Sequence, residues 1–426
     1  MKEDFLQYIW QYQLFNTTDL KTTIGESVYI EKTGSYDHQS GPDFKQARII
    51  INDQRWAGHI EIHVKSSDWY VHHHENDDNY NNVILHVVWE DDIPVFRSNG
   101  EVVSTLELKG LVSNFLLKTY DELTYFTKKW PTCEAYLSDI DVFTKNKWLE
   151  RLYISRLEQK SQSIDIILKQ TKNDWEYTLF ILLAKYFGLQ NNGIPFQKMA
   201  ESIDFRIIKQ ERHHPLHLEA MFLGMTGLLN NNNADYAEKL HEIFDYQMHK
   251  YNLKSINEPL TFYRLRPANF PTIRLSQLAQ LYSVNATLFS HLINDDYQTI
   301  QKRLKSETGT FWQTHYVFDK QHNKRKKQLS SSFVDLLIIN VIAPIRFAYQ
   351  KYLGEQNFNM ILTLLEAIKP EQNHIVKKFD TLNLKAENAL QSQALITLKN
   401  EYCQPKNCLH CDIGLKILKK NTPKPE

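Results

Sequence analysis

The sequence has no long apolar run and few cysteines. No stretch approaches the roughly 20 apolar residues that a membrane-spanning helix needs. Residues 1–8 lack the basic start and apolar core of a signal peptide. These absences favour a cytoplasmic protein without a membrane partner. The 4 cysteines among 426 residues are therefore expected to be reduced thiols or metal ligands before disulfides.

The chain also lacks net charge, but its charges are unevenly spread. Residues 1–130 contain 12 Lys or Arg and 20 Asp or Glu, so the remainder carries a net charge of +8. Nucleic-acid affinity depends mainly on the neutralisation of phosphates. An acidic N-terminal part would thus need bound cations, or the basic C-terminal part, to hold DNA or RNA. Charge alone argues mildly against a nucleic-acid partner and does not exclude one.

The order of patterns along the chain predicts two domains, as its length does. A helix is expected over residues 4–15, and strand-like runs follow at 27–31, 47–52, 58–65, 82–90 and 102–108. From residue 140 onward apolar residues recur every 3 to 4 positions, which is typical of helices. We therefore expect an α+β protein, with a mixed-sheet module over 1–125 and a mostly α-helical domain over 140–426.

The run from Gly58 to Lys65 is the most informative segment. Because side chains alternate along a strand, its ionisable residues share one face and its apolar residues the other. The ionisable residues are His59, Glu61, His63 and Lys65. Together with Asp43 at the mouth of the preceding strand, they could hold a divalent metal beside a phosphodiester. The alternative is an exposed strand face without chemistry.

The pattern Pro42-Asp43, a strand, a turn and Glu61-x-His63 resembles the PD-(D/E)XK phosphodiesterase superfamily. The core of that superfamily is a helix followed by strands, with an Asp on the second strand and an acid-x-Lys on the third. The resemblance implies that Asp43 and Glu61 ligate Mg²⁺ or Mn²⁺, which polarises a phosphoryl oxygen and activates a water. The usual Lys falls at His63, with Lys65 one pleat further along. Either residue would then orient the attacking water.

Histidines are dense around this strand: 7 of the 17 fall between His38 and His86. His72 and His74 would face one side of an extended segment, where they could form a second metal shell or a substrate-contact loop. The alternative is a solvated loop that caps the sheet. His86 lies in an apolar run, so a hydrogen-bonded core histidine is expected there before a ligand.

The cysteines have the spacing of a metal site. Cys403-x4-Cys408-x2-Cys411 supplies three thiolates, and Cys133 or the nearby His410 would complete a tetrahedral set. A set of four thiolates suits zinc or an iron–sulfur cluster, and the arrangement resembles the iron–sulfur staples of some PD-(D/E)XK helicase-nucleases. Unmetallated thiols are the alternative.

The helical part contains two basic segments. Arg264, Arg266 and Arg274 surround a Pro-bounded turn, where they could clamp a phosphate backbone or, more often for arginines in such positions, tie helix ends together. Residues 324–327 could contact nucleic acid or form a solvated loop.

Nearly the full length of the chain resembles an uncharacterised bacterial family of unknown function. The stretches that carry this resemblance are Ser40-Gly-Pro-Asp-Phe, Gly58-His-Ile-Glu-Ile-His, Ser67-Asp-Trp, Val83-Ile-Leu-His-Val-Val, Arg266-Pro-Ala-Asn-Phe-Pro, Ile339-Asn-Val-Ile-Ala-Pro and Cys408-Leu-His-Cys. Taken together, the sequence predicts a metal-dependent nuclease acting on DNA or RNA. The alternatives are a non-catalytic nucleic-acid- or protein-binding module on a degenerate nuclease fold, and a histidine-based hydrolase of a small molecule.

Overall fold

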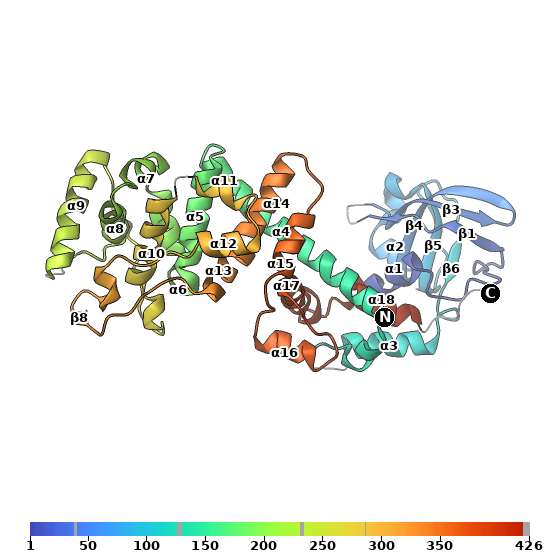
Figure 1. The fold of residues 1–426 in the computed structure, drawn as a ribbon. Helices are drawn as coiled ribbons and strands as arrows, with labels where there is room; N and C mark the ends of the chain where they lie inside the picture. The colour runs from blue at the N-terminus through green and yellow to red at the C-terminus, as the bar shows by residue number, and fades with distance from the viewer. Residues whose placement is uncertain (38–40, 126–129, 231–233, 286, 421–426) are drawn as a thin grey trace. The chain divides into compact units, whose positions relative to one another are not determined.

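The computed structural model describes residues 1–37, 41–125, 130–230, 234–285 and 287–420 (Figure 1). A mixed β-sheet near the N-terminus is followed by a mostly helical region, which confirms the predicted α+β class. Contacts divide the chain into two compact units. The first comprises residues 1–148, 378–385 and 396–426, and the second comprises 149–377 and 386–395. The C-terminal cysteines therefore belong to the same unit as the sheet, while the predicted domain boundaries at 125 and 140 stay a prediction.

The main sheet is formed by six strands in the order β1-β3-β4-β5-β6, with β2 paired to β3. Neighbours from β1 to β4 are antiparallel, whereas β4, β5 and β6 run parallel. All five predicted strand regions are confirmed. Their bounds are β1 Val28–Lys32, β2 Ser35–Tyr36, β3 Phe44–Ile51, β4 Gln54–Lys65, β5 Val83–Glu90 and β6 Thr105–Glu107.

Strand β4 is covered on both faces. Ile60 and Ile62 are fully buried, as alternation predicts, but Glu61 and His63 on the opposite face are buried as well. Helix α1 (Glu3–Gln11) packs against β4 (Figure 1). The polar face of β4 is therefore an interior site rather than a solvated edge.

The connection from β4 to β5 carries short helices. These are α2 (Asp68–Val71) and the 3₁₀ turns His74–Asn76 and Asp78–Tyr80. A parallel neighbour cannot be reached by a tight hairpin, so the chain must cross over the sheet here. Trp69 anchors the crossover in an apolar cluster with Tyr80 and Val83. This packing fixes the loop that the sequence marked by its histidines.

The remaining helices in chain order are α3 Asn114–Thr124, α4 Val142–Gln170, α5 Trp175–Phe187, α6 Leu189–Glu201, α7 Phe205–Glu211, α8 Pro215–Met225, α9 Asp235–Tyr251, α10 Pro271–Val284, α11 Leu288–Leu292, α12 Tyr297–Arg303, α13 Ser331–Leu337, α14 Ala343–Tyr352, α15 Asn359–Glu366, α16 His374–Asp380, α17 Ala389–Thr397 and α18 Asp412–Lys420. A small hairpin of β7 (His315–Val317) and β8 (Lys320–Gln321) interrupts them. The helical texture predicted from residue 140 is confirmed.

One helical stretch corrects an expectation. Residues Ser331–Tyr352 are long and apolar enough to cross a membrane by length and composition, so the prediction that no stretch comes close was wrong there. However, 72% of its most apolar window is buried inside the fold. That burial is typical of the core helix of a soluble protein.

Candidate metal centre

Two carboxylates are tied together at the start of β3 and the middle of β4. The backbone N–H of Asp43 donates to Glu61 Oε2 (3.1 Å), and Asp43 Oδ2 accepts from the backbone N–H of Ile62 (3.1 Å). Gln7 on α1 donates from Nε2 to Asp43 Oδ1 (2.9 Å). Each carboxylate oxygen has two lone pairs, so these bonds orient Asp43 and leave acceptor capacity for a cation.

Three imidazoles reach the same place. The ligand nitrogens of His63, His72 and His74 lie within 4.8 Å of one another. His63 Nε2 is 3.0 Å from His72 Nδ1. Glu61 Oε1 lies 3.5 Å from His63 Nε2 and 3.3 Å from His74 Nε2. The arrangement therefore brings a carboxylate and three imidazoles together, from one strand and the crossover that follows it.

Packing holds the histidines in position. The His74 ring stacks on Tyr80, with ring centroids 3.7 Å apart, and meets Trp69 edge-on at 5.4 Å. His63 Nδ1 lies 2.8 Å from Nε2 of His86, which is fully buried. Between the two loop histidines, His73 takes a left-handed conformation with φ 61°. This bend, rather than an extended segment, turns His72 and His74 toward β4.

The pKa values at this centre are strongly perturbed. Burial, and then the charge of Glu61, raises the pKa of Asp43 to about 7. Burial also raises the pKa of Glu61 to about 8. Burial, followed by neighbouring imidazoles, lowers the pKa of His63 to about 2 and that of His86 to about 3. Burial makes the negative charge of these carboxylates costly, and a bound cation would compensate for it. Neutral imidazoles beside them have lone pairs free to bind that cation.

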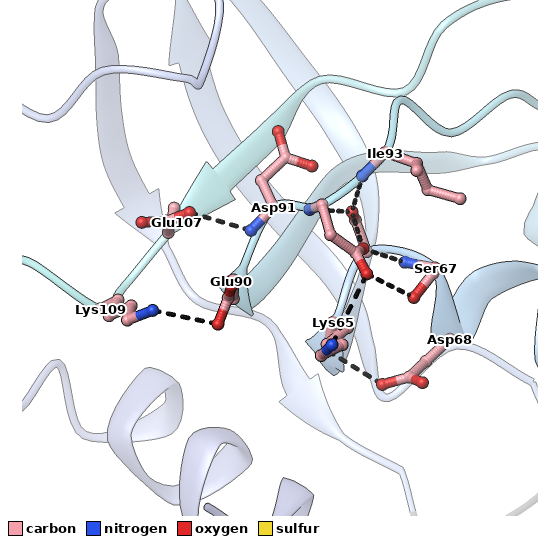
Figure 2. A network of polar contacts seen from close by, with 10 residues as sticks. Lys65, Ser67, Asp68, Glu90, Asp91, Ile93, Glu107 and Lys109 are labelled. Atoms are coloured by element: carbon pink, nitrogen blue, oxygen red, sulfur yellow. Dashed lines mark hydrogen bonds and ion pairs between the residues drawn. The ribbon is translucent and has the colours of Figure 1, made fainter.

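Lys65 does not join this group. Its Nζ lies 4.0 Å from Asp92 Oδ2, and its backbone N–H donates to Asp68 (2.9 Å). Figure 2 shows Lys65 in a separate polar network at the ends of β4 and β5, which also contains the Lys109–Glu90 pair (3.0 Å). Of the two predicted basic residues, the structure thus brings only His63 to Glu61.

Sequence reasoning missed several residues around the centre. Gln7 and the nearby Glu3 come from α1, and burial, followed by the charge of Asp43, raises the pKa of Glu3. Their helix was predicted, but no pattern indicated which of its polar residues would turn to the sheet. A hollow of about 610 Å³ adjoins β4, and its lining includes Lys32, Arg48 and His59. Alternation along β4 had already placed His59 on the face of Glu61. Lys32 on β1 and Arg48 on β3 were not predicted to line the same hollow.

The four cysteines gather within the first unit. Burial, and then the thiols of Cys411 and Cys408, raises the pKa of Cys133. Burial, and then the thiols of Cys133, Cys411 and Cys408, raises the pKa of Cys403. Burial raises the pKa of Cys411 to about 12. All four thiols are free. Thr132 Oγ1 lies 3.4 Å from Cys408 Sγ, so the segment of Cys133 lies beside the C-terminal triplet, while a metal site of these thiols stays a prediction.

The basic residues of the helical part lie in the second unit. Arg264 and Arg266 are exposed. Arg274 is buried and donates to Gln277 Oε1 (3.0 Å) and Asn269 Oδ1 (2.6 Å), so it ties the start of α10 to the turn before it.

The basic run 324–327 divides in the same way. Lys324 is exposed. Lys327 is buried and donates from Nζ to the backbone oxygens of Trp312 and His315.

A family model described as "Protein of unknown function (DUF2851)" matches residues 3–374. The chain belongs to this family. The full-length resemblance noted from its motifs is thereby confirmed, although Ser40 and His38 of the N-terminal motif region lie outside the described residues. No curated protein and no solved structure matches the chain.

Proposed function

We propose that the protein is a metal-dependent nuclease that hydrolyses phosphodiesters of DNA or RNA. The observation that carries the proposal is the meeting of Asp43 with the buried Glu61 and His63, from adjacent strands. Mg²⁺ or Mn²⁺ suits such a set, and when bound it supplies polarisation of the phosphoryl oxygen and a lowered pKa of its water.

The residues of this chain contribute orientation and charge. Asp43 is held by Gln7 and by the backbone of Ile62, so its carboxylate is aimed before any ligand arrives. His63 stays neutral because its pKa is lowered to about 2. As a neutral imidazole it could orient a water through Nε2 once the hydrogen bond between that atom and His72 Nδ1 opens.

The adjoining hollow offers a place for the rest of the substrate. Lys32 and Arg48 line it beside β4. The two cations line the hollow together with His59, which lies on the same strand as Glu61, so the hollow could hold phosphates of the chain that flank the scissile group. The two cations also compensate locally for the acidic character of residues 1–130. Nucleic acid is thus the proposed partner, and the cytoplasm the proposed location.

The test is cleavage of plasmid and single-stranded DNA, and of RNA, with Mg²⁺ or Mn²⁺. Glu61→Gln keeps the shape of the side chain and removes its charge, so it should abolish cleavage. Glu90→Gln removes an acid from the neighbouring strand that pairs with Lys109 away from the centre, and it should cleave like wild type. Equal loss in both variants, or no cleavage by wild type on any of these substrates, would refute the proposed activity.

A second candidate is a nucleic-acid- or protein-binding module without catalysis. It is favoured by the position of Lys65, which pairs with Asp92 rather than reaching Glu61. Its signature would be DNA or RNA binding by gel shift that persists in Glu61→Gln, with no cleavage by either protein.

We also propose that Cys133, Cys403, Cys408 and Cys411 bind zinc or an iron–sulfur cluster with a structural role. Four free thiols, of which those of Cys408 and Cys411 are buried, come from segments some 270 residues apart and suit such a staple. Metal analysis of the purified protein distinguishes the two: iron with acid-labile sulfide indicates the cluster, and zinc alone indicates the single ion. A preparation made with added iron and zinc that holds neither would refute the staple.

A further inference from the structure

We propose that the ion of the catalytic centre is a transition-metal ion ligated by His63, His72, His74 and Glu61, so that Mn²⁺ is preferred over Mg²⁺. The inference rests on the proposed function and deepens it by naming the metal class and by making His63, His72 and His74 ligands, so that His63 holds the ion instead of orienting the water. It can be tested by metal binding alone, independently of any hydrolysis.

The donor set decides the class of metal. Mg²⁺ prefers oxygen ligands in a strict octahedron and keeps several of its waters, whereas imidazole is a ligand of first-row transition metals, above all Zn, Cu, Fe and Ni, with Mn²⁺ the weakest binder of that series. Here three imidazole nitrogens lie within 4.8 Å of one another, with a carboxylate oxygen 3.3 and 3.5 Å from two of them. A site made only for Mg²⁺ would not gather three imidazoles around its acid.

One of the proposed ligand atoms, His74 Nε2, lacks a hydrogen-bond partner among the described residues. This atom is buried, although it lies 3.3 Å from Glu61 Oε1. A buried polar atom without a hydrogen bond costs free energy, and a bound cation would remove that cost.

The second sphere suits ligation as well. Histidine ligands usually engage their other ring nitrogen in a hydrogen bond that fixes the tautomer. His63 Nδ1 has such a partner in His86 Nε2, 2.8 Å away, which leaves His63 Nε2 for the ion. In the absence of metal that nitrogen shares a proton with His72 Nδ1. Binding of the ion would replace this shared proton.

His72 makes a clean test because it is exposed and its neighbour is a matched control. His73 follows directly, its side chain is 82% exposed, and it points away in a left-handed turn. Removal of either imidazole should leave folding intact, which far-UV circular dichroism and the thermal midpoint would verify. Only removal of His72 should weaken the metal site.

The experiment is titration of the purified full-length protein with Mn²⁺, with free Mn²⁺ measured by electron paramagnetic resonance. Mn²⁺ is chosen because it binds thiolates poorly, so binding to the cysteines should not contribute to the titration. We expect one tight site in wild type and in His73→Asn, which tolerates the left-handed conformation, at least a tenfold weaker site in His72→Ala, and little displacement of Mn²⁺ by a large excess of Mg²⁺.

Two results would overturn the inference: equal affinity of His72→Ala and His73→Asn, or displacement of Mn²⁺ by Mg²⁺ at similar concentrations. Tight, His72-dependent Mn²⁺ binding by a protein that cleaves no nucleic acid would support the metal assignment and count against the nuclease alone. The two proposals therefore fail separately.

Discussion

Substitution of Glu61 by Gln should stabilise the metal-free protein at alkaline pH. Folding raises the pKa of Glu61 from 4.5 to about 8, so the folded chain binds a proton in this interval that the unfolded chain has released. The free energy of unfolding therefore falls as pH rises from about 4.5 to 8, and above 8 the folded state holds an unfavourable buried charge.

The magnitude follows from the size of the shift. At 1.36 kcal/mol per pKa unit, a change from 4.5 to about 8 corresponds to about 5 kcal/mol as an upper bound, and relaxation of the pocket reduces it. A glutamine avoids this cost, and it keeps an acceptor for the Asp43 N–H while offering an N–H near His74. We expect a gain of about 2–5 kcal/mol at pH 9 that fades toward zero at pH 5.

The assay is urea unfolding in a chelator between pH 5 and 9, with Glu90→Gln as the matched control at an acid that pairs with Lys109 on the surface. Added Mn²⁺ should narrow the difference, because an ion at 100 times its dissociation constant stabilises wild type by about 2.7 kcal/mol and Glu61→Gln by much less. If Glu61→Gln is destabilised at pH 9 in chelator, or its effect does not vary with pH, the electrostatic account of the centre is wrong.

Three further predictions concern the scaffold. Gly58→Ala should lower stability by about 1–3 kcal/mol in thermal or urea unfolding, because its Cβ would lie 2.5 Å from the Asn82 backbone oxygen; an unchanged midpoint would contradict the close approach of β4 and β5. Cys133→Ser should reduce the zinc or iron bound per chain and lower the thermal midpoint, and a variant that keeps both would exclude Cys133 as a ligand. Arg274→Met should reduce stability by about 2–4 kcal/mol, since it strands buried hydrogen-bond partners, whereas exposed Arg266→Met should not; equal midpoints would refute a structural role for Arg274.

Much of the first unit could be predicted because its signals are local. Alternation located β4 and placed Glu61 and His63 on one face, and the apolar runs located β3 and β5. The pairing of Asp43 with Glu61 follows from an antiparallel connection between neighbouring strands, which a short turn enforces. These features depend on residues close in sequence.

The rest depends on conformation that no local pattern encodes. The turn of His72 and His74 toward β4 requires the left-handed His73 and the anchoring of Trp69, neither of which has a strong sequence signal. Alternation places Lys65 on the face of Glu61. In the structure, however, Lys65 pairs with Asp92, which follows the end of β5, and does not reach Glu61. The burial of Arg274 likewise arises from tertiary packing.

The most direct test of the metal centre is the position of a bound ion. Crystals grown with MnCl₂ should show an anomalous difference peak at the manganese edge within coordination distance of Glu61, His63, His72 and His74, with Asp43 alongside. The same peak should be missing from crystals of Glu61→Gln. A wild-type map with no peak there, or a peak held only by surface carboxylates elsewhere, would contradict the account.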